Sequence, residues 1–226
     1  SADGNFKDHD LSGAGIINGD RSRSDVLWGT AFSNINTCNG VIENGTAAEM
    51  SPSLLAEAYF FRAFDYFHLV QTFGGVPLDL GSGPLKFNTK PVRTSVRNTV
   101  PEVYQAIFSD LTFAVENLPE TARLTGTVTK NVARMYLAKA YLTYGWWLEN
   151  PGDIPTYPAT DRTCLDGKNA DWYFQQAYDV ATYAIDNPGP YGLQPTYYDV
   201  NVATNDRNTE VMLYADHTQT SEFYNA

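Results

Sequence analysis

The sequence predicts an all-α protein, mainly a tetratricopeptide-like helical-repeat scaffold with long loops and a short extended segment near the C-terminus. Five segments between residues 24 and 189 carry apolar residues at helical spacing, and most begin at residues that favour a helix start. Two of the five also resemble each other in sequence. We therefore expect one domain, residues 1–226, with a loop at 1–23, a helical scaffold at 24–189 and an irregular or extended segment at 190–226.

The first two helices are expected to follow each other closely. The first should run from Asp25 to about Glu43, with Ser24 as its N-cap, and the stretch ENGTAAEM should end it. Ser51 followed by Pro52 then marks a new helix start, because proline at the first helical position loses no hydrogen bond.

The second helix, at about 52–73, is apolar on nearly every side, so neighbouring elements should bury it from several directions. Arg62 lies among its aromatic residues, where an unpaired charge is costly. We expect Arg62 to stack on a ring and to pair with a carboxylate. Gly74 and Gly75 should end the helix in left-handed backbone, and Pro77 prevents its continuation.

Three further helices are expected after a long loop. Thr99 and Glu102 have the spacing of a capping box, which begins a third helix that ends at Leu118. Thr129 should cap the fourth helix. The last two helices are expected at about 130–148 and 170–186, and residues 209–217 (TEVMLYADH) have the alternating faces of an extended segment.

An internal repeat relates two of these helices. YQAIFSDLTFAVENLP at 104–119 aligns without gaps with FQQAYDVATYAIDNPG at 174–189. The alignment pairs Ala114 with Ala184, and we expect both alanines to occupy equivalent close helix contacts. Small residues at helical spacing let neighbouring helices come close, as they do in tetratricopeptide repeats. Repeat stacks of this kind are more typical of binding proteins than of enzymes.

Composition and charge narrow the possible functions. The net charge is −11 and the 15 Lys and Arg form no cluster, which argues against nucleic-acid binding. Aromatic residues make up 14% of the chain, which suits sugar-like ligands or wet interfaces as well as a helical core. Cys38 and Cys164 make neither a disulfide framework nor a metal site, and Cys38 is expected in the core.

Motifs for catalysis or metal binding are weak, so we expect no enzyme activity, no cofactor and no metal. The three histidines, His9, His68 and His217, lack metal-ligand spacing. Glu57 and Asp65 are a carboxylate pair of the type a glycosidase needs, but their place on a helix fits solvated or ion-paired groups better.

Residues 199–210 (DVNVATNDRNTE) are similar to a calcium loop, with acidic or amide residues at several ligand positions. Ala203 stands where a further ligand is needed, and Thr204 stands where the turn requires glycine. We therefore do not expect calcium binding there.

Five segments in order resemble the SusD/RagB family, the surface glycan-binding lipoproteins of Bacteroidetes. The most specific is AEAYFFRAFDYFHLVQTFGGVPL at 56–78, preceded by WGTAFSNINTCNGVI at 28–42. The helix at 103–119, TKNVARMYLAKAYL at 129–142 and the stretch 191–212 follow the family pattern as well. Arg62, Gly74 and Gly75 fall in the family's scaffold signature, so the resemblance assigns them a structural role.

The resemblance implies non-enzymatic capture of oligosaccharide, less often peptide, and delivery to a TonB-dependent transporter of the SusC type. It also implies an outer-membrane, surface-exposed lipoprotein whose lipid anchor is absent from this chain. Family members are usually much longer, and their second half contributes to the glycan site. Two other readings stay open: a helical-repeat adaptor for protein partners and, less favoured, an all-α glycoside hydrolase.

Ligand contacts are expected in loops, because loops on a rigid frame vary without disturbing the core. The run before the first helix offers donors and acceptors suited to sugar hydroxyls, and Phe6 is a possible aromatic platform. The candidate ligand-binding residues are Asn18, Asp20, Arg21 and Arg23. An alternative is that Asp20 and Arg21 only solvate the loop and help to cap a helix.

Overall fold

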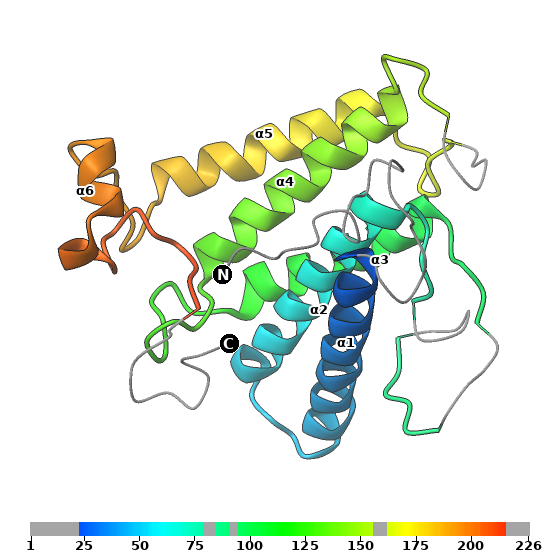
Figure 1. Cartoon of the computed structure of the whole chain (residues 1–226), viewed down its shortest axis with the longest axis horizontal. Coiled ribbons are helices and arrows are strands. Elements are labelled where there is room, and N and C mark those ends of the chain that lie inside the picture. Colours follow the sequence, from blue (N-terminus) through cyan, green and yellow to red (C-terminus); the bar gives the residue numbers. More distant parts are fainter. Residues whose placement is uncertain (1–22, 79–84, 91–94, 156–161, 216–226) are drawn as a thin grey trace, which may run out of the picture.

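The computed structural model describes residues 23–78, 85–90, 95–155 and 162–215. Within these ranges the chain forms helices and no strand (Figure 1). None of these helices has the length and apolar character needed to cross a membrane. The prediction of a mainly helical fold is confirmed. The elements are α1 (Arg23–Ala47), α2 (Pro52–Phe73), α3 (Val100–Asn117), α4 (Lys130–Glu149), α5 (Ala170–Asp186), α6 (Tyr197–Asn201) and a 3-10 turn η2 (Ala203–Asn205).

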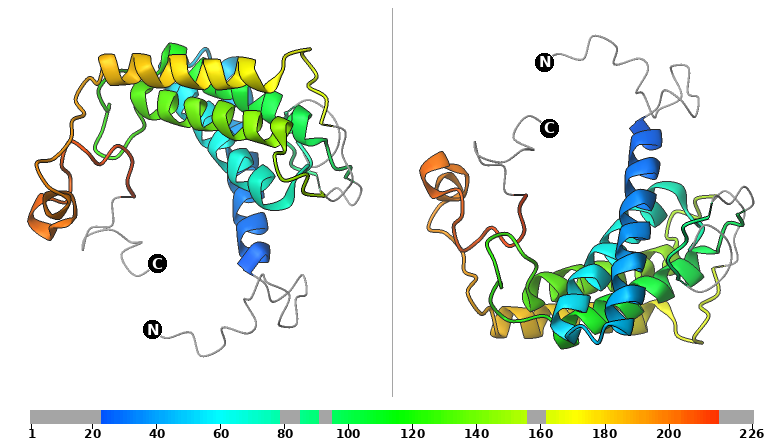
Figure 2. Two further views of the ribbon diagram at one scale, coloured as in Figure 1. Left: turned by 90° about the horizontal axis from the view of Figure 1, so that it is seen from above. Right: turned by 90° about the horizontal axis from the view of Figure 1, so that it is seen from below.

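The five long helices form a stack in chain order. α1 packs on α2, α2 on α3, α3 on α4 and α4 on α5, while other helix pairs touch only weakly. Figure 1 shows α4 and α5 side by side, and Figure 2 shows α1 and α5 at opposite ends of the stack. Such nearest-neighbour packing is typical of helical-repeat proteins. The inner helices are therefore covered from two sides, and the two end helices from one.

Aromatic rings connect the helices in the core. The ring of Tyr104 on α3 stacks on that of Tyr144 on α4 with centroids 4.7 Å apart. Phe108 on α3 stacks in turn on Tyr173 of α5 at 5.5 Å. α2 supplies ten buried residues, as its nearly all-round apolar sequence predicts. Most of the aromatic content therefore serves the scaffold.

Arg62 ties the first three helices together. Its Nε and Nη2 donate to the two carboxylate oxygens of Asp110 on α3, at 2.7 and 2.8 Å, and its Nη1 donates to Oδ1 of Asn39 on α1 at 2.8 Å. The guanidinium also lies 5.0 Å from the ring centroid of Tyr59. Both expectations for Arg62, a stacked ring and a paired carboxylate, are confirmed.

Several predicted helix starts agree with the structure. The carboxylate of Glu102 accepts from the backbone N–H of Thr99 at 2.7 Å, and the Thr99 hydroxyl accepts from the N–H of Glu102 at 3.4 Å, which completes the capping box. Thr129 precedes α4 as expected but makes no side-chain cap. Its hydroxyl instead bonds to that of Tyr191 at 2.7 Å, which fixes the segment after α5.

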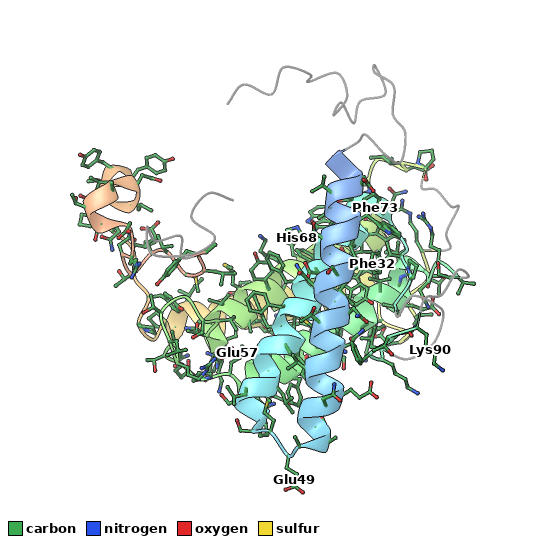
Figure 3. All side chains as sticks on the ribbon, turned by 60° about the horizontal axis from the view of Figure 1, so that its bottom comes forward. Phe32, Glu49, Glu57, His68, Phe73 and Lys90 are labelled. Atoms are coloured by element: carbon green, nitrogen blue, oxygen red, sulfur yellow. The ribbon has the colours of Figure 1, made fainter. Side chains whose placement is uncertain are left out.

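α1 extends beyond its expected end at Glu43 and continues to Ala47. A Cβ added at Gly45 would lie 2.8 Å from Cδ2 of Leu55 on α2. The glycine therefore serves close packing between two helices and does not end the first one. The turn comes later, where Glu49 has a φ of 54° at the tip between α1 and α2 (Figure 3).

The two glycines after α2 have different roles, which corrects the expectation that both adopt left-handed backbone. Gly74 has a φ of 71° and its N–H donates to the carbonyl of Val70, so it ends the helix. Gly75 is not among the residues of positive φ. A Cβ there would lie 2.0 Å from the carbonyl oxygen of Asn98, so glycine is required by close backbone approach.

The internal repeat does not place its paired alanines equally. Ala114 is fully buried within the stack. Ala184 is only half-buried and lies on the wall of an open groove. The expectation of equivalent close contacts is therefore wrong for Ala184, because α3 has a helix on each side whereas α5 packs chiefly on α4.

From the end of α5 to residue 215, where the described residues end, the chain is irregular, as expected, apart from the short helix α6 and the turn η2. It folds back on itself, because the N–H of Gly192 donates to the carbonyl of Thr209 at 3.1 Å. The N–H of Gln194 donates to the carboxylate of Glu210 at 2.8 Å. Residues 211–215 lie in neither helix nor strand.

Candidate functional site

Three of the four residues that the sequence suggests for ligand binding, Asn18, Asp20 and Arg21, lie outside the described residues, as does Phe6. Arg23 is the first residue of α1, so it lies in a helix and not in the loop expected at 1–23. The N-terminal ligand site therefore stays a prediction.

The carboxylates of α2 contact different neighbours. Glu57 binds Arg123 through two hydrogen bonds of 3.0 and 3.1 Å. Burial raises the pKa of Asp65 to about 7, and a hydrogen bond from Asn34 of α1 opposes this shift. Eight residues along a helix separate the two carboxylates by about 12 Å of rise. A glycosidase acid pair lies closer, at roughly 5–9.5 Å.

His68 packs against aromatic rings on its own helix, α2. Figure 3 shows His68 well along this helix from Glu57. The centroid of its ring lies 4.5 Å from that of Phe64 and 6.2 Å from that of Phe67. Burial, together with the charge of Lys139, lowers its pKa, so the imidazole is held neutral. The surroundings are those of a packed side chain.

The acidic residues of the calcium-like stretch have partners of their own. Asp199 lies in the first turn of α6, where its carboxylate bonds to the hydroxyl of Thr196 at 2.7 Å. Glu210 accepts from the backbone of Gln194, as above. Across the described ranges, no three His, Cys, Asp or Glu side chains come together in a way that could hold a metal ion.

A polar cluster fixes the loop between α4 and α5. Sγ of Cys164 lies 2.7 Å from Oδ1 of Asp166 and 3.1 Å from the hydroxyl of Tyr173. The Tyr173 hydroxyl donates to Asp166 at 2.9 Å, and the amide of Gln105 on α3 donates to that hydroxyl at 3.2 Å. Burial raises the pKa of Tyr173, so it stays protonated. Both cysteines are free and buried, as expected for Cys38.

A groove of about 1030 Å³ lies between α4 and α5 and is called here the α4–α5 groove. Its two walls are apolar stripes of the two helices, and the segment after α5 closes one end. Large apolar side chains are exposed in it: Tyr178 at 67%, Ile185 at 75% and Leu142 at 46%. The lining also includes Met135, Ala138, Phe174, Ala177, Ala181, Ala184, Leu193 and Met212.

Polar groups in the α4–α5 groove are few, and most are already engaged. The Asn131 amide donates to the carbonyl of Asn187 at 2.8 Å. The Thr209 hydroxyl donates to the carbonyl of Gly192 at 2.9 Å. Lys139 places its ammonium 5.3 Å from the ring centroid of Tyr136. The groove therefore offers apolar contact and little hydrogen bonding.

A second hollow, of about 240 Å³, lies between the loop 121–127 and residues 207–214. It is more polar and includes the rings of Tyr191 and Tyr214 with several threonines. Ligand pockets for small molecules usually measure about 300–1,000 Å³, so this hollow is small for a complete oligosaccharide site.

Sequence reasoning did not find the α4–α5 groove. The apolar spacing of Phe174, Tyr178 and Ile185 is visible in the sequence, but the same spacing is typical of residues that face a core. Only the packing of the helices shows that this stripe has no covering element among the described residues.

The family described as "Starch-binding associating with outer membrane" (SusD-like) matches residues 9–142. A SusD-like protein P2 of Formosa agariphila is 33% identical over 131 residues, which are 56% of this chain and 25% of that protein. A SusD-like protein of Bacteroides ovatus is 28% identical over 206 residues, 87% of this chain and 33% of that protein.

Among solved structures, one determined with a xylogluco-oligosaccharide superposes with a TM-score of 0.68 at 27% identity. It covers 88% of this chain and 36% of the solved chain. The chain thus spans between a quarter and about 40% of the length of the proteins it resembles. Because the family match covers more than half of the chain and the helical stack agrees with it, the chain belongs to the SusD-like family of starch-binding proteins that associate with the outer membrane.

Proposed function

We propose that the chain is part of a non-enzymatic surface protein that captures oligosaccharides and delivers them to a TonB-dependent transporter of the SusC type. Family membership supports the class of activity. The single observation that carries the proposal is the relative solved with a xylogluco-oligosaccharide. It has the same fold as this chain and is 27% identical in sequence over the matched 88% of this chain.

Binding without bond cleavage fits the chemistry of the described residues. The two carboxylates on α2 have different partners: Glu57 accepts from Arg123 and Asp65 from Asn34. The buried Asp110 accepts two hydrogen bonds from Arg62. Sugar capture needs only aromatic faces for stacking and side-chain donors and acceptors for hydroxyls. Peptide is the alternative ligand class that the family resemblance leaves open.

For the ligand contacts we propose the N-terminal residues Asn18, Asp20, Arg21 and Arg23. Their amide, carboxylate and guanidinium groups match the donors and acceptors of sugar hydroxyls. Relatives are much longer than this chain, so we expect these residues to form part of a site that further polypeptide completes.

Isothermal titration against a panel of xyloglucan, laminarin and starch oligosaccharides, with short peptides alongside, tests this proposal. The 226-residue chain should bind weakly or not at all. A chimera that joins it to the unmatched part of the xylogluco-oligosaccharide relative should bind at least one glycan. Tight binding by the chain alone would contradict the partial-site idea. A folded chimera that binds no glycan would contradict glycan capture.

The same chimera tests the N-terminal residues. Asp20→Ala with Arg21→Ala should weaken its glycan affinity. Glu57→Ala with Arg123→Ala, which also removes one acidic and one basic side chain, is the matched control. An unchanged affinity in the double variant would remove Asp20 and Arg21 from the site. Chromatography of the titration mixtures should show the oligosaccharides intact, and shortened products would instead indicate a hydrolase.

We further propose that the protein is anchored by lipid at the cell surface. Protease treatment of intact cells should degrade it while leaving cytoplasmic proteins whole. Survival in intact cells, with degradation only after lysis, would contradict the surface assignment. Copurification with a TonB-dependent transporter from detergent-solubilised membranes would test the SusC-type partner.

A further inference from the structure

The two ends of the helical stack differ in character. Most exposed positions of α1 are polar, for example Thr30, Ser33 and Thr37. α5 instead exposes Tyr178 and Ile185, and only three of its residues are buried. An end helix of a repeat stack needs a polar outer face, because otherwise its apolar side chains stay in water. α5 therefore has the composition of an inner helix that packs a second neighbour.

The α4–α5 groove has the shape that a second neighbour requires. Phe174, Tyr178, Ala181 and Ile185 lie at i, i+4, i+7 and i+11 on α5, so they form one stripe of about 16 Å along the helix. Met135, Ala138 and Leu142 form the matching stripe on α4. Alanines between the larger residues let a third helix come close, and the larger residues can pack between its side chains.

The chemistry of this groove argues against a sugar as its occupant. Hydroxyl-rich ligands need free donors and acceptors, and a buried polar group without a partner is costly. The Asn131 and Thr209 side chains on the rim already bond to backbone carbonyls. An apolar polypeptide face has no hydrogen bonds to lose in such surroundings, and the burial of its apolar area favours binding.

We propose that the α4–α5 groove binds the apolar face of a further amphipathic helix, supplied by the part of a SusD-like protein outside the region that this chain matches. The xylogluco-oligosaccharide relative contains such additional polypeptide, because the match covers 36% of its length. This proposal rests on family membership and not on glycan binding. The two can therefore fail separately.

Cysteine labelling tests the occupant directly. Ile185→Cys places a thiol in the groove, and Leu165→Cys, 60% exposed in the loop before α5, is the matched control. Both should react rapidly with a maleimide in the 226-residue chain. In the chimera described above, Ile185→Cys should be protected about tenfold or more relative to Leu165→Cys. Equal labelling in a folded chimera would overturn the proposal.

Two further outcomes would also overturn it. Protection of Ile185→Cys that rises with the concentration of the 226-residue chain alone would show a second copy in the groove. Protection by added oligosaccharide would show a glycan site there.

A second measurement needs no chimera. If the groove is unoccupied in the isolated chain, Tyr178→Asp with Ile185→Asp should leave its melting temperature unchanged and reduce the binding of a dye for exposed apolar surface. The same change on the buried face of α5, at Tyr173, which does not line the groove, is the contrast: Tyr173→Asp should unfold the chain. A large fall in melting temperature for the double variant would mean that the stripe belongs to the core of the chain itself, which would also overturn the proposal.

Discussion

The guanidinium of Arg62 and the carboxylate of Asp110 face each other in the centre of the helical stack, joined by two hydrogen bonds of 2.7 and 2.8 Å. Both side chains are almost fully buried, at 5% and 4% exposure. The pair links α2 to α3, and the third bond of Arg62, to Asn39, adds α1. A buried ion pair contributes little net stability but makes the loss of one partner costly, because a lone charge is left in the core.

Asp110→Ala should therefore destabilise the chain by about 3–5 kcal/mol, measured by urea unfolding. Arg62→Met with Asp110→Leu should restore most of that stability, since neither charge remains. Arg123→Ala, which breaks the exposed pair with Glu57, is the control and should hardly change the unfolding midpoint. If Asp110→Ala unfolded like the parent, the loss of the Asp110 carboxylate would not leave a costly unpaired charge on Arg62.

The two glycines after α2 allow the cost of a steric clash, at Gly75, to be compared with the cost of a positive φ, at Gly74. Gly75→Ala should cost more than Gly74→Ala, because its Cβ would meet the Asn98 carbonyl at 2.0 Å. Gly74→Ala should cost roughly 1–3 kcal/mol for a φ of 71° that L-residues disfavour. Thermal unfolding of both variants measures the order. The reverse order, with Gly75→Ala close to the parent, would mean that the approach of Asn98 does not require glycine at position 75.

Local signals in the sequence were enough for most helix starts. Ser51 precedes α2 and Pro52 is its first residue, while the capping box of Thr99 and Glu102 begins α3. These signals act over three or four residues, so the sequence alone reveals them. The partners of Arg62 could be predicted by kind, since a buried charge needs a counter-charge. That Asp110 is the partner depends on how α2 lies against α3, and spacing alone does not give it.

The features that sequence reasoning missed are all tertiary. Gly45 continues α1 because Leu55 packs against it, and Gly75 is needed because Asn98 passes close by, so the reason for each glycine lies far away in the chain. The α4–α5 groove depends on the absence of a covering element over Ile185 among the described residues. The ligand residues proposed near the N-terminus lie outside those residues, so they stay a prediction.

The unequal packing of the repeated alanines leads to a further prediction. Ala114→Leu should overpack the buried face of α3 and cost about 1–3 kcal/mol in urea unfolding. Ala184→Leu should be nearly neutral, because its side chain would extend into the open α4–α5 groove. Equal losses in the two variants would mean that α5 is as tightly covered as α3.

Asp65 should make stability depend on pH. Burial raises its pKa in the folded chain to about 7, above its ordinary value of 3.8, so the folded state holds a proton that the unfolded state has lost. The stability from this proton is fully present below about pH 4 and is lost as the pH rises through about 7. At pH 8 the folded chain must keep a charged carboxylate half-buried between α1 and α2.

Asp65→Asn removes that charge, so it should raise the melting temperature at pH 8 more than at pH 5. The variant is compared with the parent at each pH, so the contributions of other titrating groups to the melting temperature cancel. His68 is one such group: because its pKa is lowered, its contribution to stability rises with pH, whereas that of Asp65 falls. Asp186→Asn, at the exposed end of α5, is the control for the substitution itself and should change the melting temperature little. A gain for Asp65→Asn that is equal at both pH values would show that the Asp65 carboxylate does not titrate near neutrality in the folded chain.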